Sequence, residues 1–183
     1  SVLYWQESLE SEPRQLLDPN TLSADGTVSL SGYEVSDDGR YLAYGLSGAG
    51  SDWQEWHVRE VTSAQDLPDL IQWVKFSGAS WTPDNLGFYY SRYAAPAEGE
   101  TYKVANYNQK LYYHRLGEPQ SADQLVYQRP DQPEWGFGGE VTADGAFLVI
   151  NVWHGTNQEN GLFYQPLFQP GAVVVELFNT FDA

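Results

Sequence analysis

The stretch Val141-Thr-Ala-Asp-Gly-Ala-Phe-Leu-Val-Ile150 decides the fold, because two more copies of its pattern occur earlier in the chain. Val35-Ser-Asp-Asp-Gly-Arg-Tyr-Leu-Ala-Tyr44 and Trp81-Thr-Pro-Asp-Asn-Leu-Gly-Phe-Tyr-Tyr90 align with it without gaps. The shared order is an apolar residue, Ser or Thr, any residue, Asp, Gly or Asn, and then an apolar strand. Asp-Gly and Asp-Asn favour tight hairpins, because Gly and Asn tolerate a positive φ angle. Each copy therefore predicts a strand, a hairpin turn and a second strand.

Two further strands are expected after each copy. The third strand contains an apolar residue at an equivalent place, namely Trp56, Leu111 and Leu162. The interval is longer in the middle copy, where the polar stretch 94–108 is interpreted as a long loop. The fourth strand begins about 14 residues later, around Leu70, Leu125 and Val174. Four strands in a repeat of about fifty residues are typical of a β-propeller blade.

The first residues resemble the outer half of another blade. Leu3-Tyr-Trp-Gln6 is similar to a third strand, and Leu17 follows Leu3 at the same offset of 14 residues. The prediction is one all-β propeller domain of about three and a half blades. Its parts are the outer strands of one blade over 1–22 and full blades over about 26–72, 73–130 and 133–178. A ring cannot close from these parts, so we expect blades to continue on both sides.

Three glycines stand at matching positions just before the motif. Gly32, Gly78 and Gly138 each precede the first motif residue by three positions. The innermost strands of a propeller crowd around its axis, where a missing side chain lets backbones approach closely. We therefore expect these glycines to lie on innermost strands, against neighbouring backbone.

The charge and composition exclude several classes of partner. The 183 residues include 25 Asp and Glu but only 9 Lys and Arg, which gives a formal net charge of −16. Such a surface repels nucleic-acid phosphates and anionic lipids, so neither nucleic acid nor membrane is an expected partner. Either the acidic surface is simply solvated, or its field favours cationic peptides. The chain has no Cys, which excludes disulfides and thiolate metal sites.

No catalytic motif is present in the sequence. The nucleophile elbow Gly-x-Ser-x-Gly is absent, since the stretch 45–49 fails at its last position. His57 and His114 fall on equivalent third strands, so both are interpreted as structural, whereas His154 lies in a predicted loop. No His pair has zinc spacing, and the acidic residues do not follow the twelve-residue calcium-loop pattern. We expect no metal, no cofactor and no catalytic residue in this chain.

Several segments of the sequence resemble the amino-terminal half of the propeller of the prolyl oligopeptidase family. In chain order they are Leu17-Asp-Pro-Asn-Thr-Leu22, Leu42-Ala-Tyr-Gly-Leu-Ser47, Gly50-Ser-Asp-Trp53, Leu67-Pro-Asp69, Val74-Lys-Phe-Ser77, Trp81-Thr82, Tyr112-Tyr-His-Arg-Leu-Gly117, and Gln120-Ser121 before Asp123. The match runs almost from end to end of the chain. It departs mainly over 94–108, 135–139 and 152–160.

The resemblance implies a serine peptidase that cleaves short peptides after proline. In that family a Ser-Asp-His triad lies on an α/β-hydrolase domain, which is absent from this chain. A seven-bladed propeller with an unsealed ring caps the triad and keeps folded proteins out. This chain would be part of that substrate-filtering cap and inert on its own. Its partners would be short proline-containing peptides and the hydrolase domain. The resemblance further implies a cytoplasmic location, and export to the periplasm stays open because any signal peptide would precede Ser1.

The resemblance also implies roles for five residues. Phe76 matches an aromatic residue that lines a substrate subsite, although it could instead be a core residue of its blade. Asp52 matches an acid that faces an arginine of the hydrolase domain, although it could instead be a turn acid. Trp135, Phe137 and Thr156 fall near further positions that line the substrate pocket. The sequence differs from the family pattern around these three, so its subsites are expected to differ in shape.

Two alternative functions fit the same fold. The first is a non-catalytic propeller that serves as a platform for protein interactions, as many propellers do. The second is the cap of an oligopeptidase B-like or dipeptidyl-peptidase-like enzyme, whose preference is not for proline. The complete open reading frame would separate these alternatives, because a peptidase requires a Gly-x-Ser-x-Gly elbow with Asp and His downstream.

Overall fold

The computed structural model describes residues 2–48, 50–97 and 106–181, and almost all of its regular structure is β-strand. The strands fall into a two-stranded half-blade followed by blades A, B and C. The half-blade contains β1 (Leu3–Trp5) and β2 (Arg14–Leu17), and blade A contains β3 (Val28–Val35), β4 (Tyr41–Gly48), β5 (Gln54–Glu60) and β6 (Gln65–Val74). Blade B contains β7 (Ser80–Trp81), β8 (Gly87–Arg92), β9 (Lys110–Arg115) and β10 (Gln124–Tyr127). Blade C contains β11 (Trp135–Val141), β12 (Phe147–His154), β13 (Asn160–Pro166) and β14 (Val175–Phe178).

Helical structure is confined to two short 3₁₀ turns among the described residues. These are η1 (Pro19–Thr21), which follows β2, and η2 (Gln120–Ala122), which precedes β10. No helix in this part of the chain is long and apolar enough to cross a membrane.

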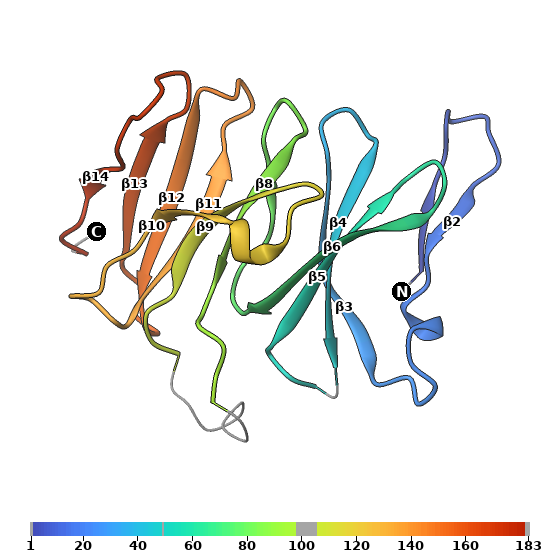
Figure 1. Ribbon diagram of the computed structural model, residues 1–183, viewed down its shortest axis with the longest axis horizontal. Helices are drawn as coiled ribbons and strands as arrows, with labels where there is room; N and C mark the ends of the chain where they lie inside the picture. The colour runs from blue at the N-terminus through green and yellow to red at the C-terminus, as the bar shows by residue number, and fades with distance from the viewer. Residues whose placement is uncertain (1, 49, 98–105, 182–183) are drawn as a thin grey trace.

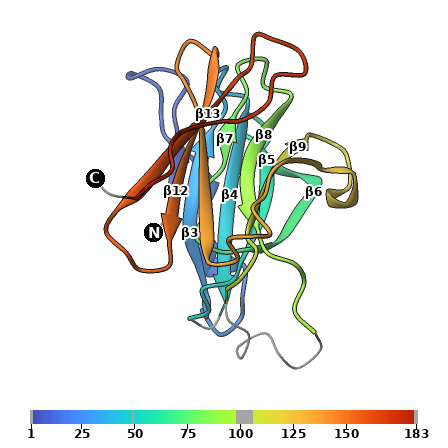
Figure 2. The ribbon, with the colours of Figure 1, turned by 90° about the vertical axis from the view of Figure 1, so that its left-hand side faces the viewer.

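Each blade is an antiparallel sheet whose strands are hydrogen-bonded in chain order. Blades A and B are joined into one sheet by a single backbone pair, between Val74 on β6 and Arg92 on β8. Figure 1 shows the blades side by side, from the half-blade near the N-terminus to blade C near the C-terminus. In Figure 2 blade C faces the viewer, and the other blades lie behind it. The predicted fold, a partial all-β propeller, is confirmed.

The three motif copies form the same turn in the three blades. In each, the hydroxyl group of the Ser or Thr donates to Asp Oδ1, over 2.7 Å at Ser36, 2.6 Å at Thr82 and 2.6 Å at Thr142. The same carboxylate oxygen accepts the backbone N–H two residues further on. The residue after each Asp has a positive φ, as predicted, and these residues are Gly39, Asn85 and Gly145. The local motif therefore specifies the turn, and the turn connects the paired strands.

The hydrophobic cores lie between consecutive blades, because side chains alternate between the two faces of a strand. On β4, Leu42 and Tyr44 pack toward the half-blade, while Ala43 packs toward blade B. On β8, Phe88 packs toward blade A, and its neighbour Tyr89 packs toward blade C. Both faces of these middle strands are buried, which explains why their sequences read as nearly continuous apolar runs.

Two predictions need correction, one about the glycines before the motif and one about the start of β6. A Cβ atom built on Gly32 or Gly138 would lie 3.5 Å from the nearest side-chain atom, which belongs to Trp56 or Trp153 respectively. At Gly78 nothing in the described part of the chain lies within 4 Å. Tryptophan rings, not backbones, approach two of the three glycines, so the expected close approach of backbones is wrong for the described residues.

The fourth strand of blade A also begins earlier than predicted. It starts at Gln65, five residues before Leu70, and runs through Pro68. Proline cannot donate a ladder hydrogen bond, so it is found on outer strands and at irregular positions. The β5–β6 pairing indeed shifts register between His57 and Arg59, opposite Pro68. The proline therefore fits the strand by interrupting its pairing.

Candidate functional site

The predicted site residues gather at one end of the sheets. Because the strands alternate in direction, the β6–β7, β10–β11 and β12–β13 connections and residues 50–53 before β5 all lie at the same end, toward the bottom of Figure 1. Asp52 lies between β4 and β5, Phe76 lies between β6 and β7, and Thr156 lies between β12 and β13. Trp135 begins β11 at this end. We call residues 50–53, the β6–β7 connection and Gln109 the loop site.

Lys75 is the centre of the loop site. Its Nζ lies 3.3 Å from Oδ2 of Asp52, and it lies over the rings of Trp53 at 5.3 Å and Phe76 at 5.2 Å. The side chain of Lys75 is only 13% exposed, whereas that of Asp52 is 68% exposed. The aliphatic part of the lysine is thus buried, and its charge is shared between one carboxylate and two aromatic faces.

The ring of Phe76 is presented to solvent on a fixed backbone. Phe76 is 52% exposed and has a φ of 57°, and Trp73, three residues earlier, has a φ of 62°. Positive φ values in bulky residues persist only where surrounding contacts hold them, and they are common at ligand sites. Gln109 donates from Nε2 to the Lys75 carbonyl over 2.8 Å, and Ser91 N–H donates to Ser77 Oγ over 2.8 Å. These bonds hold the backbone on both sides of Phe76.

Gln109 connects the loop site to blade C. It is 1% exposed, and its Oε1 accepts the backbone N–H of Phe137 over 2.7 Å. One buried amide therefore satisfies two backbone groups from different blades, the Lys75 carbonyl and the Phe137 N–H. The position of the β6–β7 connection is thereby linked to the start of β11.

The structure does not bring all predicted site residues together at the surface. Trp135 is 7% exposed and Phe137 is 1% exposed, and both pack in the core between blades B and C. Trp135 contacts Phe181 with ring centroids 4.8 Å apart. Thr156 is exposed, in the turn after β12. Phe76 is exposed, so its alternative interpretation as a core residue is wrong; the substrate-binding roles of all four residues stay predictions.

An acidic groove runs along the innermost strands. It has a volume of about 670 Å³ and is lined mainly by β3, β7 and β11 with the segments beside them. Its lining includes Glu34, Asp37 and Glu140, and no Lys or Arg among the described residues. Burial raises the pKa of Glu34, and the nearby Glu140 carboxylate raises it further. The groove beside the first strands of the three blades is therefore rich in carboxyl groups.

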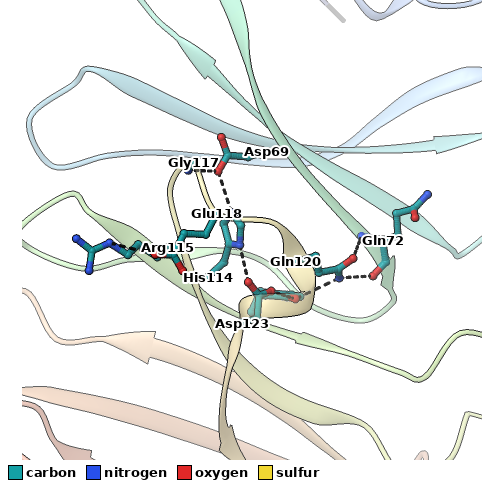
Figure 3. Close-up of polar contacts among 9 residues, drawn as sticks. Asp69, Gln72, His114, Arg115, Gly117, Glu118, Gln120 and Asp123 are labelled. Carbon is teal, nitrogen blue, oxygen red and sulfur yellow. Dashed lines mark hydrogen bonds and ion pairs between the residues drawn. The ribbon is translucent and has the colours of Figure 1, made fainter.

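A second polar cluster is buried between blades A and B (Figure 3). His114 on β9 has no exposed surface, and both of its ring nitrogens contact carboxylates. Nε2 lies 2.9 Å from Oδ1 of Asp69 on β6, and Nδ1 lies 2.7 Å from Oδ1 of Asp123. Gly117 N–H also donates to Asp69, over 2.6 Å. We call these residues, with Tyr90 Oη donating to Asp123, the histidine cluster.

The histidine cluster holds a charged imidazole. Burial alone would lower the pKa of His114, but the hydrogen bonds with Asp123 and Asp69 outweigh it and raise the pKa to about 9. A base that performs acid–base catalysis needs a ring nitrogen within reach of a substrate proton. Here both nitrogens are engaged and the ring is inaccessible. The cluster therefore joins two blades, in agreement with the structural role predicted for His114.

Sequence reasoning missed the residues that act across long distances in the chain. Lys75 and Gln109 were not identified, nor were Asp69 and Asp123 as partners of His114. The segments that resemble the prolyl oligopeptidase family could have indicated these contacts. Leu67-Pro-Asp69, Tyr112-Tyr-His-Arg-Leu-Gly117 and the residues up to Asp123 meet in the histidine cluster, and Gly50-Ser-Asp-Trp53 meets Val74-Lys-Phe-Ser77 in the loop site. Among the described residues, no group of three or more His, Cys, Asp or Glu could hold a metal ion.

Comparison with known families and proteins gives a consistent result. The model of a family described as "Prolyl oligopeptidase, N-terminal beta-propeller domain" matches residues 1–183. The chain is 40% identical over 169 residues to prolyl oligopeptidase A of Galerina marginata, a match that covers 84% of this chain and 23% of that protein. It is 36% identical over 157 residues to prolyl endopeptidase of Elizabethkingia meningoseptica, covering 86% of this chain and 22% of that protein.

Solved structures show the same similarity. Prolyl oligopeptidase B from Galerina marginata, bound to a 35mer hydrolysis and macrocyclization substrate, superposes with a TM-score of 0.81 at 31% identity, covering 91% of this chain and 25% of that one. A structure from a study of two prolyl endopeptidases and their inter-domain dynamics gives a TM-score of 0.80 at 39% identity, covering 91% and 23%. The chain thus spans about a quarter of the length of these relatives.

Proposed function

Because the chain belongs to the prolyl oligopeptidase N-terminal β-propeller family, we propose that it is part of the cap of a serine peptidase that cleaves short peptides after proline. In this proposal the segments 1–22, 26–72, 73–130 and 133–178 are consecutive parts of one propeller. The catalytic triad belongs to an α/β-hydrolase domain elsewhere in the protein, and the propeller admits short peptides and excludes folded proteins. The acidic groove on the innermost strands fits a preference for peptides without negative charge.

The observation that carries the proposal is the exposed ring of Phe76 on its fixed loop. A half-exposed aromatic side chain on a strained, hydrogen-bonded backbone is suited to contact a ligand, since the loop does not need to reorder when the ligand binds. Asp52 and Thr156 lie at the same end of the sheets, which is the end that would face the hydrolase domain. Trp135 and Phe137 would support this surface from the core.

The isolated chain is expected to have no peptidase activity, whereas the full-length protein is expected to cleave after proline. The reason is that the triad is proposed to lie outside this chain. Both proteins can be assayed with a chromogenic Gly-Pro substrate. Turnover by the isolated chain that persists through repurification would contradict the proposal, and so would a full-length protein that leaves proline peptides intact.

Asp52→Ala is expected to lower kcat/KM of the full-length protein by a small factor. Exposed ion pairs contribute about 0–1 kcal/mol, so the loss should be at most about fivefold. We propose that Asp52 meets an arginine of the hydrolase domain when the two domains close. For the short Gly-Pro substrate, which does not reach Phe76, the loss should therefore be larger at low salt than at high salt, because ions screen such pairs.

The matched control for Asp52→Ala is Glu12→Ala, which removes the same charge from the exposed β1–β2 connection of the half-blade. The control should change kcat/KM equally little at both salt concentrations. An effect of Asp52→Ala that does not depend on salt would refute the interdomain contact.

A further inference from the structure

We propose that Lys75 is a positioning residue that orients the ring of Phe76 toward the substrate and couples it to the β4–β5 connection. The inference rests on the proposed function and extends it to a residue outside the predicted site. Its starting point is that the Phe76 backbone is fixed but its ring is half exposed. An exposed phenylalanine ring on a fixed backbone can still rotate among its side-chain rotamers. Some contact must select one of them if the ring is to form one wall of a subsite.

The ammonium group of Lys75 provides that contact. It lies 5.2 Å from the centroid of the Phe76 ring, within the range of a cation–π interaction. The interaction has a direction, because the cation is attracted to the face of the ring and not to its edge. A lysine held in place therefore favours the rotamer of Phe76 that turns one face to Nζ and leaves the opposite face free.

The β4–β5 connection holds the lysine in place. The Trp53 ring lies 5.3 Å from Nζ on one side, and Oδ2 of Asp52 lies 3.3 Å away. Trp53 is itself held by edge contacts with Trp73 at 5.9 Å and Tyr93 at 6.0 Å. Only 13% of the lysine side chain is exposed, so these partners compensate for part of the hydration that the lysine gives up. The Phe76 ring thus depends on a second loop through one side chain.

This arrangement defines the kind of substrate that should respond to Lys75. A peptide with only the residues next to the scissile bond does not extend to a remote aromatic wall. A longer peptide with an apolar side chain at the matching position gains contact with the free face of Phe76. Lys75 should therefore affect the binding of longer peptides and leave the chemical step unchanged.

The test uses Lys75→Met in the full-length protein, which keeps the length of the side chain and removes its charge. For an internally quenched proline peptide of about ten residues, KM should rise about three- to tenfold, the size of effect expected from the loss of one or two cation–π contacts. kcat should stay within about twofold, because the lost contact binds the substrate and its transition state equally well. KM for a chromogenic Gly-Pro substrate should not change, and Lys75→Arg should restore most of the binding of the longer peptide.

Two controls separate positioning from charge and from folding. Lys110→Met removes the same charge from β9, and it should leave both substrates unaffected. The double variant K75M/F76A should have the same KM for the longer peptide as F76A alone, because Lys75 acts through Phe76. Additive effects of the two substitutions would overturn the inference. An equal loss for both substrates with a lower Tm would overturn it as well, since Lys75 would then be structural.

The outcome for the wild-type protein distinguishes this inference from the function on which it rests. If the wild type cleaves both substrates and Lys75→Met changes neither KM, only the role of Lys75 is refuted. If the wild type cleaves neither substrate, the proposed peptidase function fails, and the role of Lys75 fails with it.

Discussion

Replacing His114 by Gln is expected to destabilise the contact between blades A and B by about 3–5 kcal/mol, the usual result of removing one partner from a buried ionic cluster. Within the histidine cluster the imidazolium of His114 is the only cation. Its loss leaves two buried carboxylates, Asp69 and Asp123, without their counter-charge. Asp69 already has one oxygen, Oδ2, with no hydrogen-bond partner among the described residues. Hydrogen-exchange protection of amides in β6 and β9 of the full-length protein measures the loss.

His57→Gln is the matched control for the histidine cluster. His57 is on the equivalent strand of blade A and stacks on Tyr44 with ring centroids 5.4 Å apart. Burial lowers the pKa of His57 and outweighs the nearby Asp66 and Glu55 carboxylates. Its replacement therefore removes no buried counter-charge and should lower stability by less than about 1.5 kcal/mol. The triple variant D69N/H114Q/D123N should recover much of the loss caused by His114→Gln, because it removes the unpaired charges. Equal effects of His114→Gln and His57→Gln would show that the cluster contributes no more than ordinary packing.

The raised pKa of His114 also gives this contribution a pH dependence. The pKa is about 9 in the folded protein and about 6.5 when the chain is unfolded. The folded state therefore holds its proton more tightly, so the stabilisation is fully present below pH 6.5. It decreases as the pH rises from 6.5 to 9 and is lost above that, by about 3 kcal/mol in total. The pKa of Tyr90 is raised, first by burial and then by Asp123, so Tyr90 stays protonated throughout this range. The decrease should be absent in His114→Gln.

Phe76→Ala is expected to lower kcat/KM for longer proline peptides by about 1–3 kcal/mol, or roughly 5- to 150-fold, the range for removal of a group that fills a pocket. Because the ring is 52% exposed, its removal leaves no cavity in the core, so Tm should change little. Short substrates that do not reach the ring should be cleaved at the normal rate. Michaelis–Menten parameters for a series of peptides of increasing length provide the measurement.

Phe88→Ala is the matched control for Phe76→Ala, since Phe88 is fully buried in the core between blades A and B. That substitution should lower stability by about 3–5 kcal/mol and affect substrates of every length alike. A Phe76→Ala variant that behaves like Phe88→Ala would show that Phe76 serves the fold and not the substrate.

The parts of the fold that could be predicted are those encoded locally. The Ser/Thr-x-Asp-Gly/Asn turn needs only five neighbouring residues, and its hydrogen bonds and positive φ appear in all three copies. The alternation of apolar residues then places the strands. Even here, one boundary was missed, because β6 begins at Gln65 and not around Leu70, and it accommodates Pro68 by a shift in register.

The site could be predicted only in part, because its contacts join residues far apart in the chain. Lys75 meets Asp52 across 23 positions, and Gln109 reaches the carbonyl of Lys75 across 34. His114 meets Asp69 across 45 positions. No periodicity or spacing reports such pairs, since they arise only when one blade packs on the next. The exposure of Phe76 and the burial of Trp135 likewise depend on the packing of the blades and not on the local sequence.

The repeated turn has a consequence for the order in which the chain folds. Each turn closes its hairpin within a few residues, and hairpins form in about 1–10 μs. Contacts between blades connect distant residues and must wait for larger loops to close, which makes them slower. Hairpins therefore form first, and the single backbone pair between β6 and β8 leaves the docking of blades A and B to side chains. Until docking is complete, apolar faces and unpaired strand edges are exposed, and these are the surfaces through which a folding intermediate aggregates.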